Sequence, residues 1–221
     1  MSWGMALFWT KALIMTILGS LLVSAGSVVG IRSGTEEPRH SVIERLAPNI
    51  EVRRYEPRLA AETTVPGAAA TARGEGFNRL AGYIFGANQG SNRIAMTAPV
   101  AQAAAPGDRI AMTAPVAQEQ AAPGWVIRFF LPAGLDQPPV PRDDRVRIVP
   151  VPAETVAVLR FSGLATDAAI ATNRAALLDA LQATRWRSAG EPVSWFYDPP
   201  WTLPPLRRNE VAVPVTAEAT P

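Results

Sequence analysis

The side chains that most often carry out catalysis are scarce in this sequence. It contains one histidine, His40, and no cysteine among its 221 residues. Thiolate catalysis, iron–sulfur clusters and zinc fingers need cysteine, whereas catalytic triads and histidine metal centres need imidazole inside the fold. His40 lies in the polar stretch 35–40, which is typical of an exposed tether. The sequence therefore indicates none of these sites.

Two other patterns resemble catalytic motifs but have simpler explanations. Asp143 and Asp144 lie between Arg142 and Arg145 in an expected loop, where solvated ion pairs are more common than acid–base catalysis. The glycines of residues 74–77 lack the third glycine and the preceding strand of a dinucleotide-binding motif. We therefore predict that the chain is not an enzyme.

The remaining chemistry belongs to arginine and to apolar side chains. Lys11 is the only lysine, so arginine provides the other basic residues, and the formal net charge is only +2. Such a small charge does not favour a nucleic-acid partner. The 48% hydrophobic content is enough for the core of one globular domain.

The first element along the chain is an apolar leader helix. Residues 12–31 carry no charge, and about 20 such residues can cross a bilayer as a helix. Residues 1–31 are therefore a signal peptide or a membrane anchor. We favour the anchor because the apolar run continues past the small residues at 23–26. In both cases we expect an exported or membrane-anchored protein that faces the bacterial periplasm.

The body of the chain predicts an α+β domain over residues 49–215, after a tether at 32–48 and before a tail at 216–221. One helix carries Phe77, Leu80, Ala81 and Ile84 on one face and stops at Gly86, and a second covers residues 167–184 with Thr166 as its cap. Strands are expected at 50–55, 59–65, 94–100, 125–131, 146–151, 155–161, 193–197 and 210–215. This order indicates two similar halves that share an antiparallel sheet.

Residues 93–118 hold a tandem duplication, because the sequence of residues 93–102 recurs without change at residues 109–118. The two copies either pair as a hairpin across residues 105–108, or one copy forms a strand and the other extends a loop. We favour the second outcome because a loop insertion costs little free energy.

Several segments of the domain resemble the SOUL haem-binding proteins. The resemblance covers residues 49–215 and rests on the opening strand 51–55, the helix 76–86, the M-T-x-P-V strand 94–100, and the C-terminal segments 197–200 and 207–211. The family pattern contains the M-T-x-P-V strand once, so the duplication is a departure from it.

The resemblance implies a distorted antiparallel β-barrel of about eight strands with two flanking helices, related in shape to the ligand-binding domains of gyrase-inhibitor-like regulators. It also implies reversible, non-catalytic binding of haem or another tetrapyrrole. The pocket would lie on the first helix, at Phe77, Leu80, Ala81 and Ile84, opposite residues 197–201.

The side-chain chemistry is compatible with such a ligand, because haem is an apolar plate with two propionates. Trp195, Tyr197 and Trp201 could join Phe77 as walls, and Arg79, Arg207 or Arg208 could bind the propionates. The alternative is that the helix face packs the core and that these arginines form surface ion pairs.

The iron has no evident protein ligand. Some family members place a histidine in the opening strand, and Arg54 occupies that position here. We therefore expect weak or no ligation, no protein metal site, and metal-free porphyrin binding about as well as haem. Two other functions stay open at this point: sensing or sequestering of other amphipathic small molecules, and an interaction module of the cell envelope.

Overall fold

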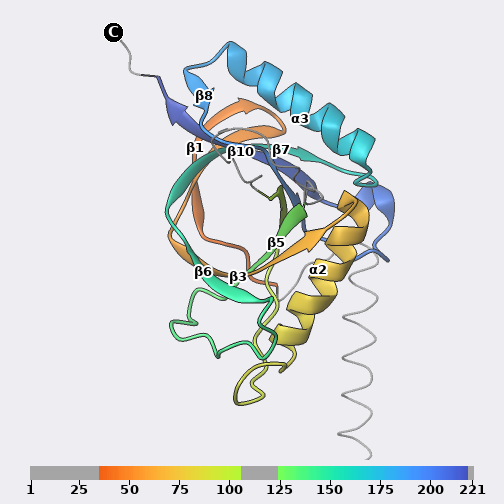
Figure 1. The fold of residues 1–221 in the computed structure, drawn as a ribbon. Helices are drawn as coiled ribbons and strands as arrows, with labels where there is room; N and C mark the ends of the chain where they lie inside the picture. Colours follow the sequence, from red (N-terminus) through yellow and green to blue (C-terminus); the bar gives the residue numbers. More distant parts are fainter. Residues whose placement is uncertain (1–34, 106–123, 219–221) are drawn as a thin grey trace, which may run out of the picture.

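The computed structural model describes residues 35–105 and 124–218 as one sheet with helices on its surface (Figure 1). The strands and helices of these residues are β1 (His40–Ala47), β2 (Ile50–Tyr55), β3 (Arg58–Pro66), α2 (Ala69–Ile84), β4 (Val100–Ala104), β5 (Gly124–Phe130), β6 (Arg147–Val151), β7 (Glu154–Phe161), α3 (Asp167–Gln182), β8 (Trp186–Ser188), β9 (Val193–Phe196), the 3-10 helix η1 (Pro204–Leu206) and β10 (Asn209–Ala217). The predicted α+β class is confirmed.

The sheet is open, so the expected closed barrel is wrong. Its strand order is β1-β2-β7-β10-β9-β4-β5-β3-β6, with β8 added on β10, and the named strands pair antiparallel. Within the described residues, the end strands β1 and β6 do not pair with each other. The sheet also contains 10 strands rather than about eight. The strong curvature visible in Figure 1 gives the sheet a concave face without joining its edges.

The predicted division into two similar halves stays an interpretation of the strand order. Outward from the paired strands β9 and β4, one side continues through β10, β7, β2 and β1, and the other through β5, β3 and β6. In each half the long strand leads into a helix, since β3 precedes α2 and β7 precedes α3. The halves also exchange strands: β2 pairs with β7, and β6 pairs with β3.

Helix α2 packs closely on the sheet through a glycine. An added Cβ at Gly76 would lie 2.4 Å from Cγ1 of Ile127 in β5, so only glycine allows this approach of helix to strand. The helix begins at Ala69, earlier than the apolar spacing alone indicated. It ends as predicted, because Gly86 adopts a φ of +115° and Asn88 donates to the carbonyl oxygen of Tyr83.

Helix α3 covers the other half of the sheet. Its predicted cap is confirmed, because the Thr166 side chain accepts a hydrogen bond from the Ala169 amide. Leu177 and Leu181 are its buried residues, and they pack in one cluster with Trp186 and with apolar residues of β2, β7 and β10. The two helices thus cover the same side of the sheet in the two halves, and the concave side carries a third cluster.

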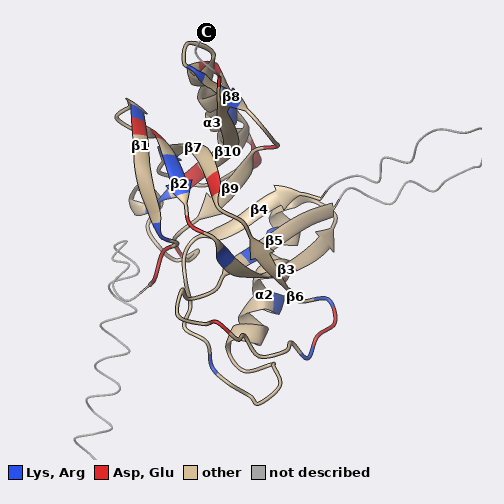
Figure 2. Cartoon of the chain, turned by 90° about the vertical axis from the view of Figure 1, so that its left-hand side faces the viewer, with Lys and Arg blue, Asp and Glu red and all other residues tan. Residues whose placement is uncertain are grey.

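Residues 40–47, which the sequence indicated as part of a tether, form strand β1. This strand pairs with β2, and the His40 ring lies 4.8 Å from the Tyr55 ring. Polar and apolar residues are mixed in β1, and most of them are exposed because it is an edge strand, so its sequence lacks the apolar run of a central strand. Figure 2 shows the charged residues of β1 and β2 at this end of the sheet.

The first copy of the duplicated sequence enters the sheet later than predicted. Strand β4 begins at Val100, whereas residues 94–97 form no named strand. Residues Val100–Gln102 pair with β5 on one edge and with β9 on the other, so they have no edge left for a hairpin with the second copy. The second copy itself lies outside the described residues.

The predicted leader, residues 1–31, also lies outside the described residues. Within residues 35–105 and 124–218, neither helix is long and apolar enough to span a membrane. At the other terminus, β10 extends beyond the predicted domain end, since Thr216 and Ala217 pair with β8.

Candidate functional site

Three of the predicted binding residues on α2 are core residues. Leu80, Ala81 and Ile84 are buried against β3 and β5, in the cluster that contains Ile127 and Phe129. A ligand could contact them only if the helix moved away from the sheet. The core-packing alternative therefore describes their position, and their role in binding stays a prediction.

Phe77 and Arg79, both on α2, differ in exposure, since the Arg79 side chain is only 8% exposed. The Phe77 side chain is 38% exposed, and its ring meets the Phe129 ring edge-on at 5.3 Å between centroids. Arg79 is held in place, because its Nη1 donates to Thr63 Oγ1 at 2.7 Å and its Nη2 forms an ion pair with Glu75. Phe77 is thus accessible to a flat ligand, whereas Arg79 already has partners.

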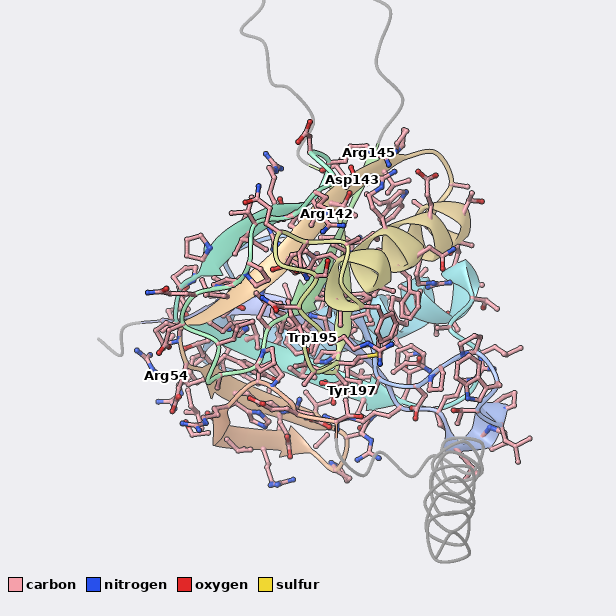
Figure 3. The ribbon with its side chains drawn as sticks, turned by 90° about the horizontal axis from the view of Figure 1, so that it is seen from below. Arg54, Arg142, Asp143, Arg145, Trp195 and Tyr197 are labelled. Atoms are coloured by element: carbon pink, nitrogen blue, oxygen red, sulfur yellow. The ribbon has the colours of Figure 1, made fainter. Side chains whose placement is uncertain are left out.

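Trp195 and Tyr197 face away from α2. Successive side chains of a strand alternate between the two faces of a sheet, and both residues belong to the concave cluster with Tyr55 and Phe130. Figure 3 shows their labels near the middle of the molecule. The structure therefore does not bring Trp195 and Tyr197 together with Phe77 in one groove.

Phe196, which the sequence reasoning missed, is the β9 residue that faces α2. The guanidinium carbon of Arg73, on α2, lies 4.4 Å from the centroid of the Phe196 ring. Arg73 is one helical turn before Phe77, so the two side chains share a face of the helix. Strict alternation along β9 was the signal that could have placed Phe196 on this face.

Arg73 forms no ion pair with a carboxylate in the part of the chain that the structure describes. Its Nη1 is buried and has no hydrogen-bond partner within the described residues. Burial lowers the pKa of Arg73, and Asp167 at the start of α3 opposes this shift without forming an ion pair with it. Figure 1 shows the beginnings of α2 and α3 next to each other at this end of the sheet. An unpaired buried donor favours an anionic or oxygen-bearing ligand.

The segment after β9 adds exposed apolar surface. Trp201 is 63% exposed, and Leu164, Leu203 and Leu206 are also exposed large apolar residues. The amide of Gly163 donates to the carbonyl oxygen of Pro204, which joins the residue before Leu164 to η1. Arg207 donates to the carbonyl oxygens of Thr202 and Pro200, so it fixes this segment.

The concave side of the sheet contains a buried ion network that no single sequence motif indicated. Arg53 forms an ion pair with Glu210 at 3.0 Å, and Arg208 pairs with Glu210 and Glu37 at 2.9 Å each. The Tyr197 hydroxyl donates to Glu210 at 2.7 Å. Burial would lower the pKa of Arg53, but Glu210 and Tyr55 more than offset this effect, so the pKa of Arg53 is raised.

The tyrosines are poor candidates for an iron ligand. Burial raises the pKa of Tyr55 to about 12, although Arg53 acts in the opposite direction. Burial also raises the pKa of Tyr83, and burial together with Glu210 raises the pKa of Tyr197 well above its usual range. Tyrosine ligates haem iron as the phenolate, which these shifts disfavour near neutral pH.

Neither the position of Arg54 nor that of Asp143 supports a catalytic or metal-binding role. Arg54 is exposed on β2 and lies at the outside of the molecule in Figure 3. Asp143 accepts hydrogen bonds from Arg145, which is the main reason why its pKa falls to about 2. A carboxyl group with so low a pKa stays ionised near neutral pH and cannot act as a general acid there. Within residues 35–105 and 124–218, no group of three potential ligands could hold a metal ion.

Solved structures share the fold of this chain at low sequence identity. The crystal structure of the EcmrR C-terminal domain matches with a TM-score of 0.51 and 12% identity, over 76% of this chain and 97% of that one. The cryo-EM structure of the EcmrR–DNA complex matches with a TM-score of 0.53 and 12% identity, over 77% of this chain and 57% of that one. The crystal structure of a hydrolase from Listeria innocua matches with a TM-score of 0.51 and 10% identity, over 76% of this chain and 92% of that one. At such identities the likeness shows the fold alone.

The family comparison is more specific. No curated protein matches this chain. The family model described as SOUL heme-binding protein matches residues 35–214, which include β1 and nearly all of β10. This match extends over most of the sequence and contains both helices and nearly the whole sheet. The chain therefore belongs to the SOUL heme-binding protein family.

Proposed function

We propose that this protein binds haem or another tetrapyrrole reversibly and without turnover, on the surface between α2, β9 and the segment 198–207. The observation that carries the proposal is Arg73, a half-buried arginine beside the Phe196 ring, whose buried Nη1 has no hydrogen-bond partner in the part of the chain that the structure describes. Membership of a heme-binding family makes a tetrapyrrole the ligand to test first.

The residues present fit the porphyrin ring and its carboxylates. Phe77 and Trp201 offer exposed aromatic faces, and Leu203 and Leu206 extend the apolar surface. Arg73 supplies a charged donor for a propionate, and hydrogen bonds to charged groups are stronger than those between neutral groups. Bound haem would supply a redox-active iron, while the chain binds the ring and its carboxylates.

The donor set favours weak or absent iron ligation. The single histidine packs against Tyr55 on β1, far along the sheet order from β9. The raised pKa values of the tyrosines disfavour phenolate ligands, and an arginine occupies the family's histidine position. We therefore expect metal-free porphyrin to bind about as well as haem, in a carrier or buffer rather than an enzyme.

We also propose that the protein is exported or tethered to a membrane. The apolar run at residues 12–31 would tether or export the domain, so that the carrier faces the periplasm. Whether this leader is cleaved can be read from the mass of the mature protein isolated from membranes.

A hemin titration of the full chain, followed by visible absorbance, tests the proposal. Phe77→Glu should weaken binding about tenfold, because it removes apolar contact area and adds a charge that repels propionates. Phe85→Glu is the matched control, since Phe85 is also an exposed phenylalanine at the end of α2. Equal losses in both variants would contradict this site. A sharp six-coordinate spectrum abolished by one substitution would contradict weak ligation.

A further inference from the structure

A cavity of about 550 Å³ lies away from the proposed haem surface. Its wall consists of four segments and Thr97: the segments are residues 36–39, residues 56–59, residues 130–136 from the end of β5, and residues 150–152 at the end of β6. None of the haem-site residues on α2 or β9 lines it. Cavities of roughly 300–1,000 Å³ accommodate small-molecule ligands.

One wall of the cavity is the chain segment before β1, residues 35–39, which we name the strap. The Glu36 carbonyl accepts from the Ala98 amide at 2.9 Å, and the Glu36 carboxylate accepts from the Ala133 amide at 2.9 Å. Glu37 is bound to Arg208 at 2.9 Å. The strap is therefore anchored at several points, so the cavity has a fixed shape.

Arg58 gives this cavity a polar anchor. Its side chain is only 9% exposed, and its guanidinium lies between the rings of Tyr55 and Phe130, at 4.9 Å and 4.6 Å from their centroids. It forms an ion pair with Glu154, yet its Nε is buried and has no hydrogen-bond partner within the described residues. A buried N–H without a partner is unfavourable, so a ligand oxygen that accepts from it would be bound selectively.

The remaining walls of the cavity are apolar, and its rim carries acidic residues. Leu59, Leu131, Leu135 and Val151 provide apolar walls. Glu56 and Asp136 are exposed at the rim, and neither forms an ion pair within the part of the chain that the structure describes. Arg39 is the other basic residue of the lining, so carboxylates outnumber guanidinium groups here. The rim therefore favours a positively charged group and disfavours a dianion such as haem.

We propose that this cavity binds a second ligand, a small amphipathic amine that also carries a carbonyl oxygen. The oxygen accepts a hydrogen bond from Arg58 Nε, the apolar body contacts the leucine walls, and the ammonium group faces Glu56 and Asp136. This site is separate from the haem surface, and it does not depend on haem binding.

Calorimetric titration of the full chain with L-leucyl-L-phenylalaninamide tests the proposal, since this probe has an amine, carbonyl oxygens and apolar side chains. Its N-acetyl analogue keeps the oxygens but lacks the charge, and should bind at least tenfold more weakly. The double variant Glu56→Gln and Asp136→Asn should also weaken the amine about tenfold, because it removes the rim charge from exposed positions. Asp144→Asn, an exposed carboxylate outside the cavity, is the matched control and should change nothing.

Two further variants separate this site from the haem site. Arg58→Lys keeps a positive charge but lacks the Nε donor, and should weaken the probe about tenfold; if it does not fold, the rim variant decides alone. Phe77→Glu should leave probe binding unchanged while it weakens hemin. Failure of the amine to bind, equal binding of the acetylated analogue, or loss of probe binding in Phe77→Glu would each overturn the proposal.

Discussion

Phe196, the last residue of β9, and the next residue, Tyr197, each have an arginine guanidinium group over the ring. The two arginines differ in their hydrogen-bond and ion-pair partners. Arg73 lies 4.4 Å from the Phe196 centroid on the helix-covered side, and Arg208 lies 3.7 Å from the Tyr197 centroid on the concave side. Arg208 pairs with Glu37 and Glu210, whereas Nη1 of Arg73 has no hydrogen-bond partner among residues 35–105 and 124–218.

The pKa values of the two arginines therefore shift in opposite directions. Burial lowers the pKa of Arg73. Burial would also lower the pKa of Arg208, but Tyr197, Glu210 and Glu37 raise it. When a buried cation is paired with carboxylates, removing one partner leaves an uncompensated charge and destabilises the fold. The half-buried Arg73 has no ion-pair partner within the described residues, so the tetrapyrrole surface that we propose includes Arg73, whereas the ion network lies on the concave side.

We expect the largest loss of stability from a substitution in the buried ion network on the concave side. Glu210→Gln removes the carboxylate that Arg53 and Arg208 share, and we expect the free energy of unfolding to fall by about 3–5 kcal/mol, as for other buried ion pairs that lose one partner. Urea denaturation measures this change. Glu191→Gln, at an exposed ion pair with Arg174, is the control and should leave the midpoint unchanged. A Glu210→Gln midpoint equal to that of the control would refute the structural role.

Alkaline pH should lower the stability of the protein through Tyr55, which lies on the same concave side. Tyr55 has a folded pKa of about 12, and an unfolded tyrosine has a pKa of about 10. Because the folded pKa is raised, this contribution is fully present below about pH 10 and is lost as the pH rises to about 12, by roughly 2–3 kcal/mol in all. Urea midpoints measured across this range should fall, and Tyr55→Phe should reduce the slope. A pH-independent midpoint would contradict the burial of this hydroxyl.

The comparison of the two arginines can be tested directly with one substitution at each. Arg73→Met should keep or raise stability, since it removes a poorly solvated charge, but should weaken hemin about tenfold, in line with roughly 1.5 kcal/mol for a charged hydrogen bond. Arg208→Met should destabilise the fold instead. Hemin titrations and urea curves of both variants provide the readout. If Arg73→Met bound hemin like the unmodified chain, the assignment of this face would be wrong.

The smallest expected effect concerns the duplication. Deletion of residues 103–118 removes one copy and shortens the connection between β4 and β5. It also replaces Ala103 and Ala104, at the end of β4, with Glu119 and Gln120. Changes in loop length alter loop-closure free energy only slowly, so stability should change by less than about 1 kcal/mol. Thermal unfolding and hemin binding should both match the full chain. A variant that failed to fold would show that both copies are structural.

Local patterns predicted most elements because they depend on neighbours in the chain. Thr166 marks the start of α3 and Gly86 the end of α2, since caps and left-handed turns are local features. Strand β5 matches its aromatic and β-branched run. Edge strand β1 and short strand β8 were missed, because their residues form strands only through pairing with β2 and β10.

The sequence by itself determined the two helices, most of the strands and the family, because each depends on local residue spacing or on a linear motif. Only the tertiary structure decided which side chains share a surface. A one-residue step along β9 separates Phe196 from Tyr197 and places them on opposite faces, and distant residues such as Glu37 and Arg208 meet only when the sheet curves. The unpartnered donors of Arg58 and Arg73 are likewise visible only in three dimensions, since pairing depends on what lies nearby in space.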